Sequence, residues 1–230
     1  MTAPLRIVSL VFPHVTQLDL TGPLQVLSRL PGAVVDLAWH RVEPVPTDSG
    51  FALLPTTSFA DAPQADALLV PGGRGAFELM ADPAALAFIE RQAAGARHVL
   101  GVCTGAFALG AAGLLRGRRA TTHWASHPLL ERLGAIPVAE RVVRDGRLIT
   151  GGGVTSGIDA ALVLAAEIAG DAEARAIQLT LEYDPQPPFD AGHPSRPDAD
   201  PTQVARAMDD ARRSRGPLVA RAAERLHDGR

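Results

Sequence analysis

The stretch HVLGVCTGAFALGAAGLL, residues 98–115, changes character at Cys103, the single cysteine of the chain. The residues up to it, HVLGVC, form a short apolar run, which is typical of a strand buried on both faces of a parallel sheet. The residues after it, TGAFALGAAGLL, are mostly small and apolar and predict a helix. A buried strand that passes directly into a helix indicates an α/β protein.

The rest of the chain repeats this alternation. Apolar runs predict further strands at 5–12, 33–40 and 67–73, of which the first and the last are expected to be buried. Helical spacing and helix start and stop signals predict further helices at 19–32, 82–94, 155–170 and 171–183. The pair Asp145-Gly146 between two apolar runs predicts a hairpin within 140–153. We therefore expect a doubly wound, mostly parallel sheet with helices on both faces.

The last part of the chain has a different composition. Residues 184–201 are rich in Pro, Asp and Gly and predict an extended loop, whereas residues 202–229 predict one or two helices around Gly216-Pro217. We expect residues 1–200 to form one α/β domain. Residues 201–230 would then be a helical extension that packs on that domain or on a dimer mate.

The composition of the chain is that of a globular protein and argues against several other classes of protein. The 230 residues are 47% hydrophobic and 20% charged, with a net charge of -3, which is a globular composition without the excess cation that a nucleic-acid surface needs. One cysteine cannot close an internal disulfide, and neither a signal peptide nor a membrane-spanning run is visible. We expect a soluble cytoplasmic protein with no nucleic-acid or membrane partner.

The glycines around Cys103 suggest chemistry. In GVCTG, residues 101–105, a tight turn from strand to helix would expose the sulfur at the carboxyl end of the sheet, as in a nucleophile elbow. The amides and positive dipole end of the new helix would lower the pKa of the thiol. The alternative is a small buried hydrophobe. Because the end of a strand, two glycines and the start of a helix all meet at this position, we favour the interpretation that Cys103 is a nucleophile.

A thiolate needs a proton donor, and Asp19 is the candidate. It follows the first predicted strand, whose connection opens at the same carboxyl edge as Cys103. An apolar pocket and a neighbouring thiolate would raise its pKa, so that it can act as a general acid. The alternative, that Asp19 caps the following helix, is equally compatible with the sequence.

Three neighbouring residues have less certain roles. The backbone amides of Gly72 and Gly73 could face negative charge on a bound substrate, although an ordinary tight turn explains them as well. Thr104 could donate a hydrogen bond to the thiolate or to Asp19, or cap the helix.

We expect no metal site. His123 and His127 have the spacing of two zinc ligands on a helix, but Pro128 follows and no acidic residue stands between them. We expect His123 to pack under a loop or at an interface.

Taken together, these segments resemble the ThiJ/PfpI superfamily, and within it the isonitrile hydratases. The resemblance spans about residues 5–192 and rests on FPHVTQLDLTGPLQVL, TTSFAD, LLVPGG, GVCTGAFALGAAGLLRGRRATTHW, LGAIPV and ERVVRDGRLITGGGVTSGID. It implies a flavodoxin-like fold, a homodimer and a cofactor-free hydration of an isonitrile to an N-substituted formamide. It matches Cys103 to the nucleophile and Asp19 to its acidic partner. The peptidase-like branch has His directly after the cysteine; this chain has Thr104.

Two other functions use the same residues. A glyoxalase-like enzyme of the superfamily would act on 2-oxoaldehydes with the same cysteine and acid. Some of the motifs also occur in the ligand-sensing domains of AraC-type regulators, which are not enzymes. Residues 202–230 are too short for the two helix-turn-helix motifs of such regulators.

Overall fold

The computed structural model describes residues 3–228. Its centre is a seven-stranded sheet in the order β10-β11-β7-β6-β1-β2-β5, in which only the pairing of β10 with β11 is antiparallel. The strands are β1 (Leu5–Leu10), β2 (Ala33–Trp39), β5 (Thr57–Ser58), β6 (Ala67–Val70), β7 (His98–Val102), β10 (Val142–Asp145) and β11 (Leu148–Gly151). The predicted doubly wound, flavodoxin-like sheet is confirmed.

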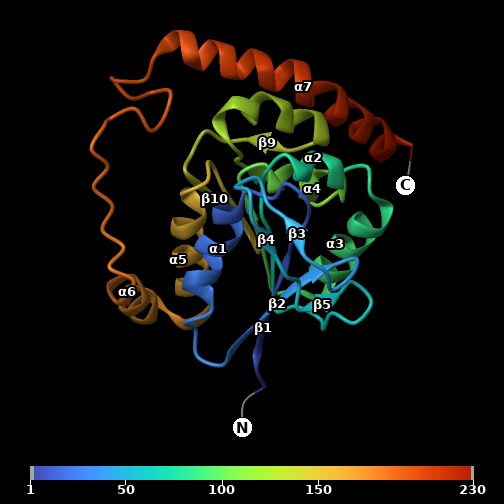
Figure 1. Cartoon of the computed structure of the whole chain (residues 1–230), viewed down its shortest axis with the longest axis vertical. Coiled ribbons are helices and arrows are strands. Elements are labelled where there is room, and N and C mark those ends of the chain that lie inside the picture. Colours follow the sequence, from blue (N-terminus) through green and yellow to red (C-terminus); the bar gives the residue numbers. More distant parts are fainter. Residues whose placement is uncertain (1–2, 229–230) are drawn as a thin grey trace.

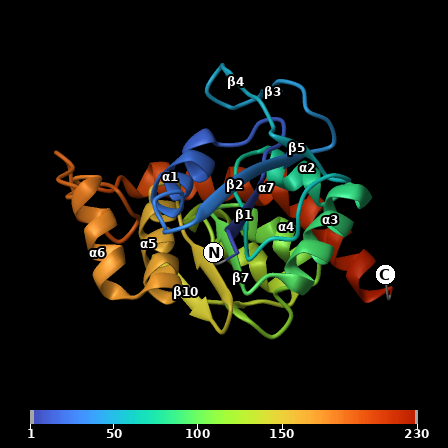
Figure 2. The same ribbon diagram turned by 90° about the horizontal axis from the view of Figure 1, so that it is seen from below.

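Helices cover both faces of this sheet. The helices α1 (Gln17–Leu27) and α5 (Ser156–Ala169) lie side by side on one face. The helices α2 (Gly75–Leu79), α3 (Pro83–Gly95) and α4 (Gly105–Ala111) lie on the other, as Figures 1 and 2 show. Because both faces are covered, β6 is buried at every residue, and its sequence ALLV is a continuous apolar run for that reason.

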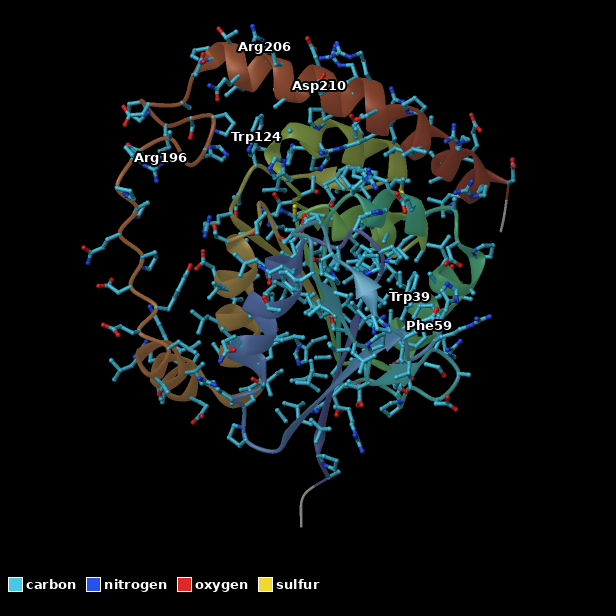
Figure 3. All side chains as sticks on the ribbon, viewed as in Figure 1. Trp39, Phe59, Trp124, Arg196, Arg206 and Asp210 are labelled. Atoms are coloured by element: carbon cyan, nitrogen blue, oxygen red, sulfur yellow. The ribbon has the colours of Figure 1, made fainter. Side chains whose placement is uncertain are left out.

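Aromatic side chains fill the core near the edge strand β5. Trp39 and Phe59, labelled in Figure 3, have ring centroids 5.6 Å apart, and Phe59 stacks on Phe88 of α3 at 4.3 Å. These contacts join β2 to α3 across the layer and hold that edge of the sheet in place.

Smaller elements lie between the main ones. A short hairpin pairs β3 (Val45–Pro46) with β4 (Ala52–Leu53), and β8 (Arg119–Ala120) pairs with β9 (Ile136–Pro137) in parallel. The 3-10 helix η1 (Trp124–Leu133) lies between β8 and β9. The helix predicted for 104–115 is shorter than expected: it ends at Ala111, because the chain turns at Gly113 with a φ of 75°.

The C-terminal part leaves the body of the protein and returns to it. After α6 (Asp171–Thr180), the chain runs without helix or strand along one side, and α7 (Pro201–His227) then crosses the molecule along η1 (Figure 1). It is one continuous helix through Gly216-Pro217. Ala211, Val219 and Ala222 of α7 are buried at helical spacing, so the helix packs against the protein on both sides of Pro217. No helix in residues 3–228 is long and apolar enough to cross a membrane.

Candidate active site

Cys103 lies at the corner between β7 and α4, in a strained conformation. Its φ of 54° is in the left-handed region, which non-glycine residues rarely adopt. The Cys103 N–H donates to the Gly151 carbonyl at 3.0 Å, and the Thr122 hydroxyl donates to the Cys103 carbonyl at 2.7 Å. A Cβ at Gly105 would lie 2.1 Å from the Val70 carbonyl oxygen, so the turn also requires glycine there.

The structure brings Asp19 to this corner. It lies in the first turn of α1, it is fully buried, and its Oδ2 accepts from the Gly72 N–H at 3.0 Å. The helix cap position is Thr16, so Asp19 is not the cap of α1. Its other oxygen, Oδ1, has no hydrogen bond of ordinary geometry and is the oxygen left for the Cys103 thiol or a substrate.

A small set of hydrogen bonds fixes the residues next to Asp19 and Cys103, and it involves Gly72, Gly73 and Thr104. The Gly73 N–H donates to Thr104 Oγ1, and the same hydroxyl donates to the Gly73 carbonyl, both at 2.9 Å. The N–H groups of Gly72 and Gly73, for which the sequence allowed either a substrate contact or an ordinary tight turn, donate to Asp19 and Thr104. They therefore position these side chains. Thr104 makes no side-chain cap bond to α4.

Burial is the main cause of the raised pKa of Asp19. It raises the pKa of this carboxyl to about 7, against the hydrogen bonds from Cys103 and Gly72, which lower it. The negative charge of Asp48 adds a smaller increase. The raised pKa predicted for Asp19 agrees with this direction. Near neutral pH the carboxyl exists in both forms.

The pKa of Cys103 is raised, and the lowered value that we expected is wrong. The residue is 5% exposed, and burial is the first cause, followed by the charge of Asp19. Hydrogen bonds from Thr104 lower the pKa by less. The helix α4 has only seven residues, and burial outweighs the effect of its N-terminus.

The histidines noted in the sequence lie on η1. His123 caps this 3-10 helix by accepting the Ala125 N–H at Nδ1, at 3.3 Å. Burial and the charge of Arg215 lower its pKa, so it is neutral at physiological pH. Within residues 3–228, the structure gathers no three His, Cys, Asp or Glu side chains that could hold a metal ion.

One partly buried charged residue of α7 was not found from the sequence. Arg215 donates to Ser126 Oγ and lies over the Phe77 ring, 5.3 Å from its centroid. Burial is the first cause that lowers the pKa of its guanidinium. A polar helix so far along the chain carries no local signal that its arginine packs against η1 and α2, because only the path of residues 181–200 brings it there.

Known proteins share this fold and these segments. Residues 5–167 match the model of the DJ-1/PfpI family. The isonitrile hydratase of Pseudomonas putida is 54% identical over 215 residues, 94% of this chain and 92% of that protein. A crystal structure of a ThiJ/PfpI family protein from Pseudomonas syringae has a TM-score of 0.89 and 38% identity, covering 96% of this chain and 91% of that one.

A transcriptional regulator shows a shorter similarity. The HTH-type regulator GbdR of Pseudomonas aeruginosa is 31% identical over 106 residues, which are 44% of this chain and 28% of the regulator. The similarity to the hydratase therefore extends over nearly the whole of both proteins, whereas the similarity to the regulator is confined to a part.

Proposed function

The chain belongs to the DJ-1/PfpI family, and from this we propose that it is an isonitrile hydratase, a hydro-lyase that converts R–N≡C and water to R–NH–CHO. The similarity to the Pseudomonas putida enzyme over 94% of the chain supports the substrate class. The observation in the structure that supports the proposal is the buried pair of Cys103 and Asp19, a thiol next to a carboxyl group with which it can exchange a proton.

In the first half of the reaction, sulfur adds to the terminal carbon of the isonitrile. Asp19 takes the proton of the Cys103 thiol as the C–S bond forms, and returns it to the same carbon, which gives the thioimidate R–N=CH–S–Cys103. A carboxyl with a pKa of about 7 suits this exchange, because its two forms are close in free energy at neutral pH.

In the second half, water replaces sulfur. Asp19, again a carboxylate, accepts a proton from water as the water oxygen adds to the thioimidate carbon, and it passes this proton to the nitrogen. The C–S bond of the tetrahedral adduct then breaks, and the proton of the adduct hydroxyl returns to the sulfur of Cys103. The formamide leaves with its C=O and N–H in place, so that one water is consumed for each isonitrile.

Activity of single variants tests these roles. The protein is incubated with an alkyl isonitrile, and formamide and the intact mass of the protein are followed by mass spectrometry. We expect Cys103→Ala and Asp19→Asn to lose at least about 100-fold in kcat, since each removes a group that touches the reacting atoms. Asp171→Asn, an exposed acid in the first turn of α6, is the matched control and keeps full activity.

Two outcomes contradict the proposal. Full activity in Cys103→Ala removes the nucleophile assignment. A higher kcat/KM for methylglyoxal than for every isonitrile tested identifies a glyoxalase-like enzyme, which would use the same pair of residues.

A further inference from the structure

The corner at Cys103 has a backbone conformation that its own side chain opposes. At a φ of 54° the Cβ of a non-glycine residue crowds the following carbonyl oxygen. Glycines stand at 101 and 105, but the residue at the corner itself carries a side chain. Such a conformation persists only where the surrounding structure holds it. Contacts of the Cys103 backbone must therefore keep the sulfur in place.

Two hydrogen bonds fix the peptide groups on either side of the Cys103 Cα. The N–H donates to the Gly151 carbonyl at 3.0 Å and so continues the pairing of β7 with β11. The carbonyl accepts from the Thr122 hydroxyl at 2.7 Å. Among the residues that the structure describes, no backbone N–H donates to this carbonyl. The hydroxyl of Thr122 therefore pairs a buried carbonyl that secondary structure leaves open.

Thr122 reaches the corner from a segment that is itself fixed. It is buried, and it lies between β8 and η1. The N–H of Thr121, the residue before it, donates to Thr150 Oγ1 of β11 at 2.9 Å. Thr150 is fully buried and precedes Gly151. The same strand, β11, thus anchors the segment of Thr122 and accepts the N–H of Cys103.

The carboxyl of Asp19 is held by other elements. It lies on α1, and its Oδ2 accepts from the Gly72 N–H at 3.0 Å. A Cβ on Gly72 would lie 2.5 Å from this oxygen and 2.6 Å from the Thr104 nitrogen, so the carboxyl lies close to the peptide group that follows Cys103. A rotation of that peptide group would move the sulfur while the carboxyl stayed where it is.

We propose that Thr122 is a positioning residue of the active site: its hydroxyl holds the Cys103 carbonyl, so that the corner keeps its left-handed conformation and the sulfur stays beside Asp19. Without the hydroxyl, the peptide group between Cys103 and Thr104 can rotate toward an ordinary conformation, because the rotation no longer breaks a hydrogen bond. Its value for catalysis rests on the proposed function, in which the sulfur and Asp19 exchange a proton.

Alkylation by iodoacetamide tests the proposal without any isonitrile. The rate is followed by intact mass at pH 8.5, and the product is unambiguous because Cys103 is the only cysteine. The charge of Asp19 raises the pKa of the thiol, so Asp19→Asn speeds alkylation as long as the sulfur lies beside the carboxyl. We expect a gain of about tenfold in the protein with Thr122 and of less than about threefold in Thr122→Ala.

The conservative variant separates the hydroxyl from the rest of the side chain. Thr122→Ser and Thr122→Ala both lack the methyl group and differ only in the hydroxyl, and we expect Thr122→Ser to keep the gain of about tenfold. With an alkyl isonitrile, Thr122→Ala loses about tenfold or more in kcat while KM changes by less than about twofold, because the reacting groups are misplaced and the substrate is still bound. Thr122→Ser keeps most of the native kcat.

The matched control is Thr47→Val. Thr47 is also buried, and its hydroxyl donates to the Phe51 carbonyl at 2.7 Å, but both residues belong to the β3–β4 hairpin. We expect this variant to keep the full response to Asp19→Asn. Thermal melting verifies that each variant is folded, and Thr122→Val, which keeps the size of the side chain, gives the same test should Thr122→Ala not fold.

Three results overturn the proposal. The first is a gain of about tenfold in folded Thr122→Ala, which would show that the sulfur stays beside Asp19 without the hydroxyl. The second is a lost response in Thr122→Ser, which would assign the effect to the methyl group. The third is an equal loss in Thr47→Val, which would make it a general loss of stability. Failure of the hydratase assay alone leaves the alkylation ratios unaffected.

Discussion

At the scale of single residues, the protein buries an acidic side chain, Asp19, beside its single cysteine. Asp19 is fully buried, and its pKa is about 7 in the folded protein against 3.8 for an ordinary aspartate. The folded state therefore holds this proton more tightly than the unfolded chain does. The contribution of Asp19 to stability is fully present below about pH 4 and is lost as the pH rises to about 7.

The variant Asp19→Asn tests this dependence, since its side chain is neutral at every pH. Each pH unit between the two pKa values is worth about 1.4 kcal/mol, so we expect the variant to gain up to about 4 kcal/mol over the native protein at pH 8. At pH 4.5 the two differ by much less. Urea unfolding at both pH values measures the difference. A gain that is the same at pH 4.5 and pH 8 contradicts a raised pKa.

At the scale of elements, the site is a junction of strand ends and helix starts. Gly72 ends the turn after β6 at a place with no room for a side chain: a Cβ would lie 2.5 Å from Asp19 Oδ2 and 2.6 Å from the Thr104 nitrogen. Because this turn comes so close to both residues, its backbone N–H groups can bind the side chains of Asp19 in α1 and of Thr104 at the start of α4.

We therefore expect Gly72→Ala to displace both side chains. The variant loses about 1–3 kcal/mol of stability and at least about 100-fold in kcat, because the Cys103–Asp19 geometry shifts. Gly216→Ala is the control: no atom lies within 4 Å of its Cβ position, and alanine favours the helix α7 by up to about 1 kcal/mol. Thermal melting and the formamide assay measure both. Native activity in Gly72→Ala would show that the site tolerates the added carbon.

At the scale of the whole molecule, the segment between α6 and α7 lies apart from the central sheet and its helices (Figure 1). The segment from α6 to the start of α7 runs outside the body in Figure 1, and it exposes Leu179 at 82% and Phe189 at 77%. Large apolar side chains so exposed favour contact with another surface. We propose that this surface is a second copy, as in the homodimer that the resemblance implies, and that the dimer works in the cytoplasm.

Light scattering after size exclusion tests the assembly. We expect a mass of about twice the 24.1 kDa of one chain at micromolar concentration. The value stays the same when salt is raised, because burial of apolar area is not screened. A mass of one chain across the concentration range excludes the homodimer.

Local pattern was enough to predict much of the sheet and part of the site. The burial of β1, β6 and β7 follows from their mostly apolar sequences, and the corner at Cys103 follows from the glycines around it. Asp19 was predicted at the same edge because the connections of parallel strands open there. These features depend on neighbours a few residues away, which the sequence displays directly.

Only the tertiary structure decided the charges and partners at the site. The pKa of Cys103 is raised chiefly because segments from distant parts of the chain bury the thiol. The hydrogen bonds from Gly72 and Gly73 join residues far apart in the sequence, and so do the contacts of Arg215 with Ser126 and Phe77. The sequence by itself determined which elements form and which two residues carry the proposed chemistry, since periodicity and turn residues are local. The packing of distant segments determined their protonation and their neighbours, because solvation and electrostatic energy are summed over everything that surrounds a group in space.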